Sequence, residues 1–358
     1  MQKKLLIFGI MLTLLVSCGK GKEETKTETA PTTEVKTEEK TSENAQMAKK
    51  NPFLSAEVYG ITHFDSSQSD SFPYAVKTGD FNVDLKKYPQ VTGGPVNIIT
   101  LASTSPDYMW GVSSQGVTYI NTAGGKFEEL ARFNIPDLKP TSLEEHEKVL
   151  RQDFTDINQV AKAIKDNYGF GFERIFGGVY SVVDNQNVVY ADYGVTIYAF
   201  GLADEKDPKA GVKVLRTIDL SKILDKGEAI SGLSMTYDGK LIVVGNHSLA
   251  VVDREFKETP QIVKFDKSEY VSNSVAVDEN NGIYIASDKY MRKIVWTGTK
   301  LSEDEKDGAW KTEYEIGQQP PAVKVGKGTG STPTLMGFGS DEDKLVVITD
   351  GAERMNIV

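Results

Sequence analysis

The chain has 358 residues and carries 51 acidic against 41 basic side chains, which gives a formal net charge of −10 at pH 7. This acidity excludes nucleic acid and anionic lipid surfaces as expected partners, because phosphate groups repel an acidic protein. A single cysteine excludes an intramolecular disulfide and a cysteine-based zinc site.

The N-terminal stretch 1–18 has the layout of a secretory signal. Two lysines precede an apolar run over residues 5–16. The stretch LVSC, residues 15–18, resembles the lipobox of bacterial lipoproteins. That resemblance implies lipidation of Cys18 and cleavage before it, so that lipid chains hold the protein to a bacterial membrane with its folded part outside the cytoplasm, in the cell envelope. No later run of about 18 apolar residues follows, so lipid is the expected anchor.

Residues 19–51 have the composition of a disordered tether. They contain seven lysines and seven glutamates, many threonines and few apolar side chains, so they bury too little surface to fold. A random coil of this length spans roughly 30 Å. A neutral spacer is the favoured interpretation, and a charged binding tail is the alternative.

Residues 52–358 repeat a strand pattern that predicts an all-β fold. The clearest copy, NVVYADYGVTIYAF over 187–200, has two short strands that turn at Asp192-Tyr193-Gly194. Later copies place Asn or Asp five residues after the first apolar position of a strand. These polar positions are Asn246, Asp288 and Asp350, and Ser114 takes the same place in a weaker early copy. Counted from Asp192, successive polar positions are 54, 42 and 62 residues apart, which fits four-stranded blades with variable loops.

The predicted architecture is a β-propeller, because blades stacked around an axis bury both sheet faces and leave only short edges. Residues 58–64 are the expected place for an N-terminal strand that helps to close the ring. The blades are expected at about 92–136, 177–220, 229–266, 271–316 and from 330 onward.

Between the first two blades the apolar period changes from two to 3.6 residues. Capping-box spacing at 142–145 and 156–159, followed by an apolar stripe, predicts a short helical insertion over about 141–167. It serves either as a fixed cover on the ring or as a lid or docking element. Four aromatic residues follow between Tyr168 and Phe176; core packing is favoured over a carbohydrate or planar-ligand patch.

Two stretches resemble blades of the NHL and SMP-30 (gluconolactonase-like) six-bladed propellers. They are GLSMTYDGKLIV over 232–243 and NSVAVDENNGIYIASD over 273–288, and residues 189–200 are similar to the NHL version. The resemblance implies six blades, whereas the sequence carries five with the last one incomplete. About 40–80 further residues are therefore expected after Val358 in the natural protein. A five-bladed ring closed by residues 58–64 is the alternative.

The resemblance also implies a divalent cation, commonly calcium, bound by an asparagine that opens an inner strand and by acidic residues at the channel mouth. Asn273 matches that asparagine, and Ser231 stands at the corresponding position of the preceding blade. The candidate metal set is Asn273 together with Asp192, Asp288 and Asp350, since calcium prefers oxygen ligands. The alternative is that these side chains cap tight turns of the backbone.

Two functions remain from the sequence. The favoured one is a non-catalytic, membrane-anchored lipoprotein whose propeller binds an unknown protein or small-molecule ligand. The alternative is a calcium-dependent, lactonase-like hydrolase. The three histidines His63, His146 and His247 lack ligand spacing, and no Gly-x-Ser-x-Gly motif occurs. The binding function is favoured because the metal set that the resemblance implies is incomplete: Ser231 stands where the preceding blade would need an asparagine.

Overall fold

The structure is a computed structural model of the chain. It describes residues 47–58, 65–69, 71, 78–80, 91, 97–136, 142–150, 152–155, 157–169, 180–317, 328–341 and 343–358. Cys18, most of the predicted tether and the aromatic stretch after Gly169 lie outside the described residues.

The strands of the described part form five antiparallel sheets that follow one another along the chain. The first contains β2 (Asn97–Ser103), β3 (Tyr108–Ser113), β4 (Gly116–Asn121) and β5 (Glu128–Asn134). The second contains β6 (Val182–Val183), β7 (Val189–Tyr193), β8 (Thr196–Leu202) and β9 (Val212–Asp219). The third contains β10 (Ile230–Met235), β11 (Lys240–Gly245), β12 (Ser248–Asp253) and β13 (Gln261–Lys264).

The last two sheets are less regular. The fourth contains β14 (Ala276–Val277), β15 (Gly282–Ala286) and β16 (Tyr290–Trp296), and both β17 (Leu301–Ser302) and β18 (Trp310–Glu313) pair with β16. The fifth contains β19 (Thr334–Met336) and β20 (Leu345–Val347). The final residues fold back beside β20, where Thr349 pairs with Ile357. Short 3-10 turns occur at Ala123–Gly125, Pro208–Ala210 and Glu305–Asp307.

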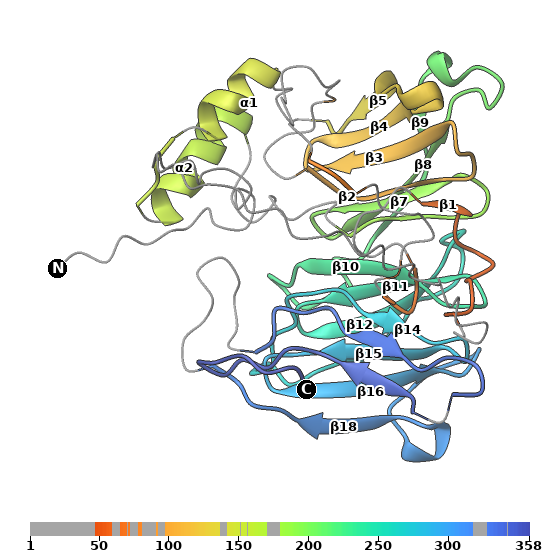
Figure 1. Ribbon diagram of the computed structural model, residues 1–358, viewed down its shortest axis with the longest axis vertical. Coiled ribbons are helices and arrows are strands. Elements are labelled where there is room, and N and C mark those ends of the chain that lie inside the picture. Colours follow the sequence, from red (N-terminus) through yellow and green to blue (C-terminus); the bar gives the residue numbers. More distant parts are fainter. Residues whose placement is uncertain are drawn as a thin grey trace, which may run out of the picture.

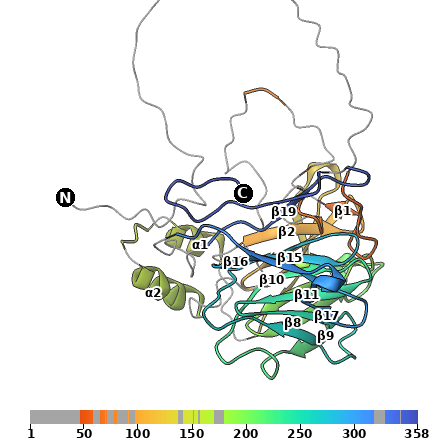
Figure 2. The same cartoon turned by 90° about the horizontal axis from the view of Figure 1, so that it is seen from below.

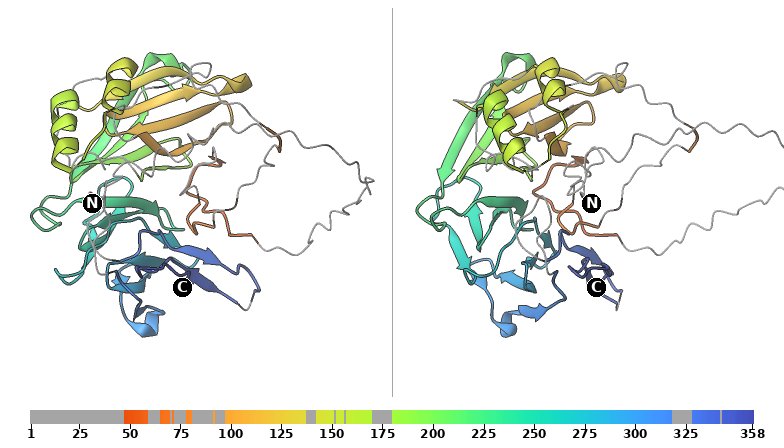
Figure 3. Two further views of the ribbon diagram at one scale, coloured as in Figure 1. Left: turned by 60° about the vertical axis from the view of Figure 1, so that its left-hand side comes forward. Right: turned by 90° about the vertical axis from the view of Figure 1, so that its left-hand side faces the viewer.

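Consecutive sheets stack face to face around a common axis (Figures 1 and 3). Separate apolar clusters fill the spaces between the first and second, second and third, third and fourth, and fourth and fifth sheets. The second strands β7 and β15 are buried at every position, because each lies between two neighbouring sheets. The outer strand β9 alternates half-buried and exposed residues, as expected where one face meets solvent. The predicted β-propeller is thus confirmed, with five sheets in the described part.

The N-terminal strand does not join the last blade. β1 (Glu57–Val58) pairs with β2, and Val58 lies opposite Ala102 in the first sheet. Val58, the one described residue of the predicted closing strand 58–64, thus belongs to the first sheet and not to the last, whereas positions 59–64 lie outside the described residues. The innermost edge of the first sheet was free to accept a strand, and the nearby chain occupies it.

The predicted helical insertion is confirmed as α1 (Leu143–Leu150) and α2 (Ile157–Tyr168). At the start of α1 the backbone N–H of Ser142 donates to Glu145 Oε2 at 3.0 Å, and the Glu145 N–H donates to Ser142 Oγ at 3.3 Å. The apolar stripe of α2 is buried in the cluster shared by the first two sheets, which favours the fixed-cover interpretation. Neither of these described helices has the length and apolar character needed to cross a bilayer.

The two ends of the ring carry different segments. We call β2, β6, β10, β14 and β19 the inner strands; in the first sheet, β1 pairs with the free edge of β2. The end where inner strands begin is the helix end, since α1 and α2 lie there. The end where they finish is the tether end, where the N-terminal residues lie. Figures 1 and 2 show α1 and α2 on one side and β1 on the other.

Candidate functional site

The strand order brings the candidate site residues to the helix end. In a meander, the inner strand begins at the same end where the second strand turns into the third. Asn273 precedes β14, and Asp288 follows β15. The structure therefore places both residues at the same end as the helical insertion.

At the helix end, Asn273 connects the segments that precede the second, fourth and fifth sheets. Its side chain is buried, and the Tyr180 hydroxyl donates to its Oδ1 at 2.9 Å. Its Nδ2 donates to the carbonyl oxygen of Gly330. Tyr180 precedes the second sheet and Gly330 the fifth, so these bonds pass the inner side of the third sheet. Ser231 has a different role, because its hydroxyl donates to Val244 O at 3.3 Å within its own sheet.

Asn246 and Asp288 fasten the turns at the end of β11 and β15. The Asn246 N–H donates to Ala229 O at 3.0 Å, and its Oδ1 accepts from the Ala229 N–H at 3.1 Å. Asp288 repeats this pair with Tyr270, at 2.8 Å for the backbone bond and 2.7 Å for the side-chain bond. Each side chain therefore adds a second hydrogen bond to the backbone one. We call this pair of bonds, which holds the turn to the segment before an inner strand, the clamp.

Asp350 holds the C-terminal fold-back. Its carboxylate accepts from the N–H of Asn356 at 2.9 Å and from Asn356 Nδ2 at 2.7 Å, and also from the N–H of Ala352 at 3.2 Å. The side-chain hydrogen bond from Asn356 lowers the pKa of Asp350 below its usual value. This carboxylate is therefore occupied by its own loop.

Asp192 is displaced from the predicted turn. It lies within β7, opposite Ile197, and is 3% exposed. The strand pairing places Gly194 at the position that Asn246 occupies in the third sheet. Gly194 adopts a φ of 74°, so the turn needs no capping acid. Ser114, by contrast, lies at the turn after β3 as predicted.

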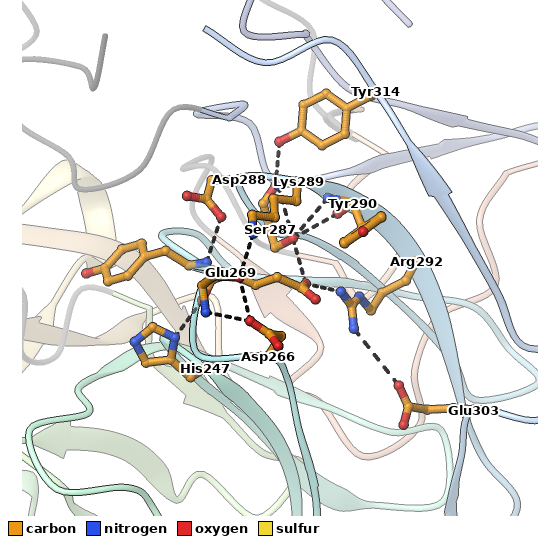
Figure 4. Close-up of polar contacts among 12 residues, drawn as sticks. His247, Asp266, Glu269, Ser287, Asp288, Lys289, Tyr290, Arg292, Glu303 and Tyr314 are labelled. Atoms are coloured by element: carbon orange, nitrogen blue, oxygen red, sulfur yellow. Dashed lines mark hydrogen bonds and ion pairs between the residues drawn. The ribbon is translucent and has the colours of Figure 1, made fainter. Parts of the chain in front are cut away.

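A buried ion pair lies beneath the Asp288 turn (Figure 4). Arg292 of β16 and Glu269 are each 4% exposed, and Arg292 Nη2 contacts Glu269 Oε2. Glu269 also accepts from Ser287 Oγ at 3.0 Å, and its carbonyl oxygen lies 2.5 Å from His247 Nδ1. Arg292 stacks on the Phe265 ring at 4.3 Å. Burial lowers the pKa of Arg292, and the Glu269 charge opposes this shift.

The preceding blade also has a buried glutamate before its inner strand, at Glu228. Glu228 is buried, accepts from the N–H of His247 at 2.9 Å, and accepts from Ser248 Oγ at 2.6 Å. Glu228 and Glu269 each end an Asp-Lys-x-Glu stretch, at 225–228 and 266–269. Sequence reasoning missed these glutamates, although this short repeat was the signal that marks them.

Three or more His, Cys, Asp or Glu side chains do not gather into a metal-binding group anywhere in the described ranges. Asn273, Asp288 and Asp350 supply oxygen atoms at the helix end, and each is hydrogen-bonded within the protein. Calcium binding stays a prediction of the family resemblance.

Of the predicted aromatic stretch, Tyr168 is described. It is fully buried in the cluster between α2 and the first two sheets. Burial raises its pKa to about 12. This supports core packing for Tyr168, while Phe170 and the residues up to Phe176 lie outside the described residues.

No family model matches the chain. It is 31% identical over 215 residues to an uncharacterized protein of Archaeoglobus fulgidus. The match covers 59% of this chain and 39% of the relative, so the chain spans well under half the length of that protein.

Two solved structures share features of its shape. One is the extracellular domain of a hybrid two component system from B. thetaiotaomicron, with a TM-score of 0.37 and 11% identity, covering 69% of this chain and 26% of that chain. The other is the β-propeller domain of Cps50 (Swd1) from Myceliophteria thermophila, with a TM-score of 0.34 and 10% identity, covering 72% and 70%. At these scores the assignment as a β-propeller protein rests on the strand pairing and sheet stacking described above.

Proposed function

We propose that this chain is a lipid-anchored lipoprotein of the cell envelope whose propeller binds a protein or small-molecule ligand at its helix end. The observation that carries the proposal is the place where the chain enters the ring. The Tyr237 hydroxyl donates to Lys49 O at 2.7 Å, and Asn51 Nδ2 donates to Met235 O at 3.0 Å, both at the tether end. A lipid on Cys18 would pull on this end and leave the helix end free for a partner.

The side chains at the helix end favour binding over hydrolysis. Asp288 and Asp350 use their carboxylates to hold backbone N–H groups, and Glu269 is paired with Arg292. A general acid or base must instead present its carboxyl group to a substrate. The ring end therefore supplies a rigid polar surface.

A calcium-dependent, lactonase-like hydrolase is the second candidate, and Asn273 is the observation that favours it. Asn273 lies buried at the start of an inner strand, where the family resemblance implies a metal ligand. This hypothesis predicts that Asn273→Ala lowers calcium affinity in calorimetry. Unchanged affinity in Asn273→Ala and in Asp288→Ala would remove both positions from the site.

The two candidates separate in a thermal-shift experiment with calcium, EDTA and a panel of small lactones. The binding function predicts the same melting temperature with calcium and with EDTA, and no lactone hydrolysis. A melting temperature that falls in EDTA, together with lactone hydrolysis that EDTA abolishes, would establish the hydrolase instead.

Lipidation and exposure are tested together by labelling with a membrane-impermeant maleimide. The parent chain should give no label, because its only thiol would carry lipid. Lys162→Cys, on the exposed surface of α2, should react when the reagent is outside the cytoplasmic membrane. Lys206→Cys, in the exposed loop at the tether end, is the matched control for the other end of the ring. Labelling of the parent chain would contradict lipidation of Cys18.

A further inference from the structure

One N-terminal segment reaches all five sheets at the tether end. We call residues 51–58 and 65–69 the latch. Its first half binds the first three sheets. β1 pairs with β2, and Ser55 N–H donates to Val183 O at 2.9 Å. In the opposite direction, Asn185 N–H donates to Phe53 O at 2.9 Å. Asn51 Nδ2 donates to Met235 O at the end of β10.

The second half of the latch binds the remaining two sheets. Val277 N–H donates to Ser66 O at 2.6 Å, and Ser67 Oγ donates to Val277 O at 3.2 Å. Leu335 N–H of the fifth sheet donates to Ser67 O at 3.1 Å. Ser66 and Ser67 are buried. The backbone N–H groups of Val277 in β14 and Leu335 in β19 are thus satisfied by the latch rather than by a neighbouring strand.

Asn51 connects the two halves. Its side chain is buried, and Nδ2 donates to Ser66 Oγ at 3.0 Å as well as to the Met235 and Thr236 carbonyl oxygens. Its Oδ1 accepts from the Phe53 N–H at 3.0 Å. One amide group therefore ties the first half, the second half and the third sheet together.

We propose that the two halves of the latch act as one cooperative unit that holds the five inner strands together at the tether end, with Asn51 as its coupling residue. Releasing Asn51 then loosens sheets that it does not touch, because Ser66, which precedes Ser67 in the chain, loses the hydrogen bond from Asn51 Nδ2. If Cys18 is lipidated as proposed above, any load on the tether reaches the propeller at Lys49 and Asn51, although the latch itself does not depend on that anchor.

Hydrogen exchange at single backbone amides of the full-length protein tests this proposal. Asn51→Ala should speed exchange at Val277 and Leu335 by about tenfold or more, alongside Asn185. Asn280→Ala is the matched control, because Asn280 is an exposed asparagine at the same end. It should leave these three amides unchanged.

A second variant covers the case in which Asn51→Ala unfolds the protein. Ser66→Ala removes one of the three acceptors of Asn51 Nδ2 and leaves the Met235 and Thr236 carbonyl oxygens, and it should accelerate exchange at Leu335 and Asn185 in the same direction by a smaller factor. Faster exchange confined to Asn185 and the third sheet in Asn51→Ala, with Val277 and Leu335 unchanged, would overturn the proposal. So would a Ser66→Ala protein that exchanges like the parent.

Discussion

Asn246 and Asp288 share one role, because each accepts a backbone N–H and returns a backbone N–H to the same residue. A neutral amide and a carboxylate both provide the required oxygen acceptor. The negative charge of Asp288 is therefore unnecessary for the clamp. Because Asn246 makes the same two bonds without a charge, the bonds of Asp288 are explained by a structural role and do not require a metal.

Asp288→Asn should leave the free energy of unfolding within about 0.5 kcal/mol of the parent, since the acceptor for the Tyr270 N–H remains. Asp288→Ala should lower it by about 1–2 kcal/mol, because that N–H loses its partner. Urea unfolding measures both values. Equal losses in the two variants would show that the charge, rather than the acceptor, stabilises the turn.

The Glu269–Arg292 pair gives a sharper contrast. Arg292→Leu should cost about 3–5 kcal/mol of unfolding free energy, because it leaves Glu269 buried without its cation. The double variant Glu269→Gln/Arg292→Leu should cost clearly less than the sum of the single variants. Chemical denaturation of all four proteins tests this cycle, and additive losses would mean that the two side chains do not depend on each other.

At the scale of elements, apolar periodicity predicted the blades and the helical insertion, because both depend on local pattern and burial. β11 and β15 are continuous apolar runs followed by a polar turn, and α2 carries a clear stripe. The position of Asp192 was misjudged by two residues. Gly194 supplies the positive φ of that turn, so the acidic residue nearby belonged to the strand.

The anchoring of α2 by Tyr168 predicts an alkaline transition. Burial raises the pKa of Tyr168 to about 12 from an ordinary value of 10.0. A pKa raised in the folded state means that the neutral phenol contributes full stability below pH 10.0, which is lost as the pH rises toward 12. Tyr168→Phe should remove part of the stability loss that the parent shows between these pH values.

Urea unfolding at several pH values between 9 and 12 provides the measurement, on the order of one point per half unit across the window. The comparison must be a difference between variants, because burial also raises the pKa of Tyr237 and of Tyr314 to about 12. Identical pH dependence in the parent and in Tyr168→Phe would contradict the burial of this hydroxyl in the folded state.

At the scale of the whole molecule, the sequence could not predict the contacts of the latch or those of Asn273 at the helix end. Residues 51–58 carry no repeat, and they bind the sheets mainly through backbone groups that every residue possesses. The family resemblance singled out Asn273, but its bonds to Tyr180 and Gly330 join positions 93 and 57 residues away. Such contacts follow from the stacking of the sheets around their axis, which local patterns do not encode.

The proposed function predicts that attachment and folding are separable. The contacts described above that hold the sheets together join residues from Lys49 onward, and Cys18 lies outside the described residues. Loss of the lipid should therefore change where the protein is found while leaving its propeller intact. Limited proteolysis provides the folding control, since an intact ring resists cleavage between its sheets.

Cell fractionation of the parent and of Cys18→Ser is the most direct test. The parent should be recovered with membranes and be released by detergent. Cys18→Ser should be secreted and soluble, with the same protease-resistant core. A Cys18→Ser protein that stays membrane-bound, or a parent chain that is soluble without detergent, would contradict the account of this propeller as a lipid-anchored envelope protein.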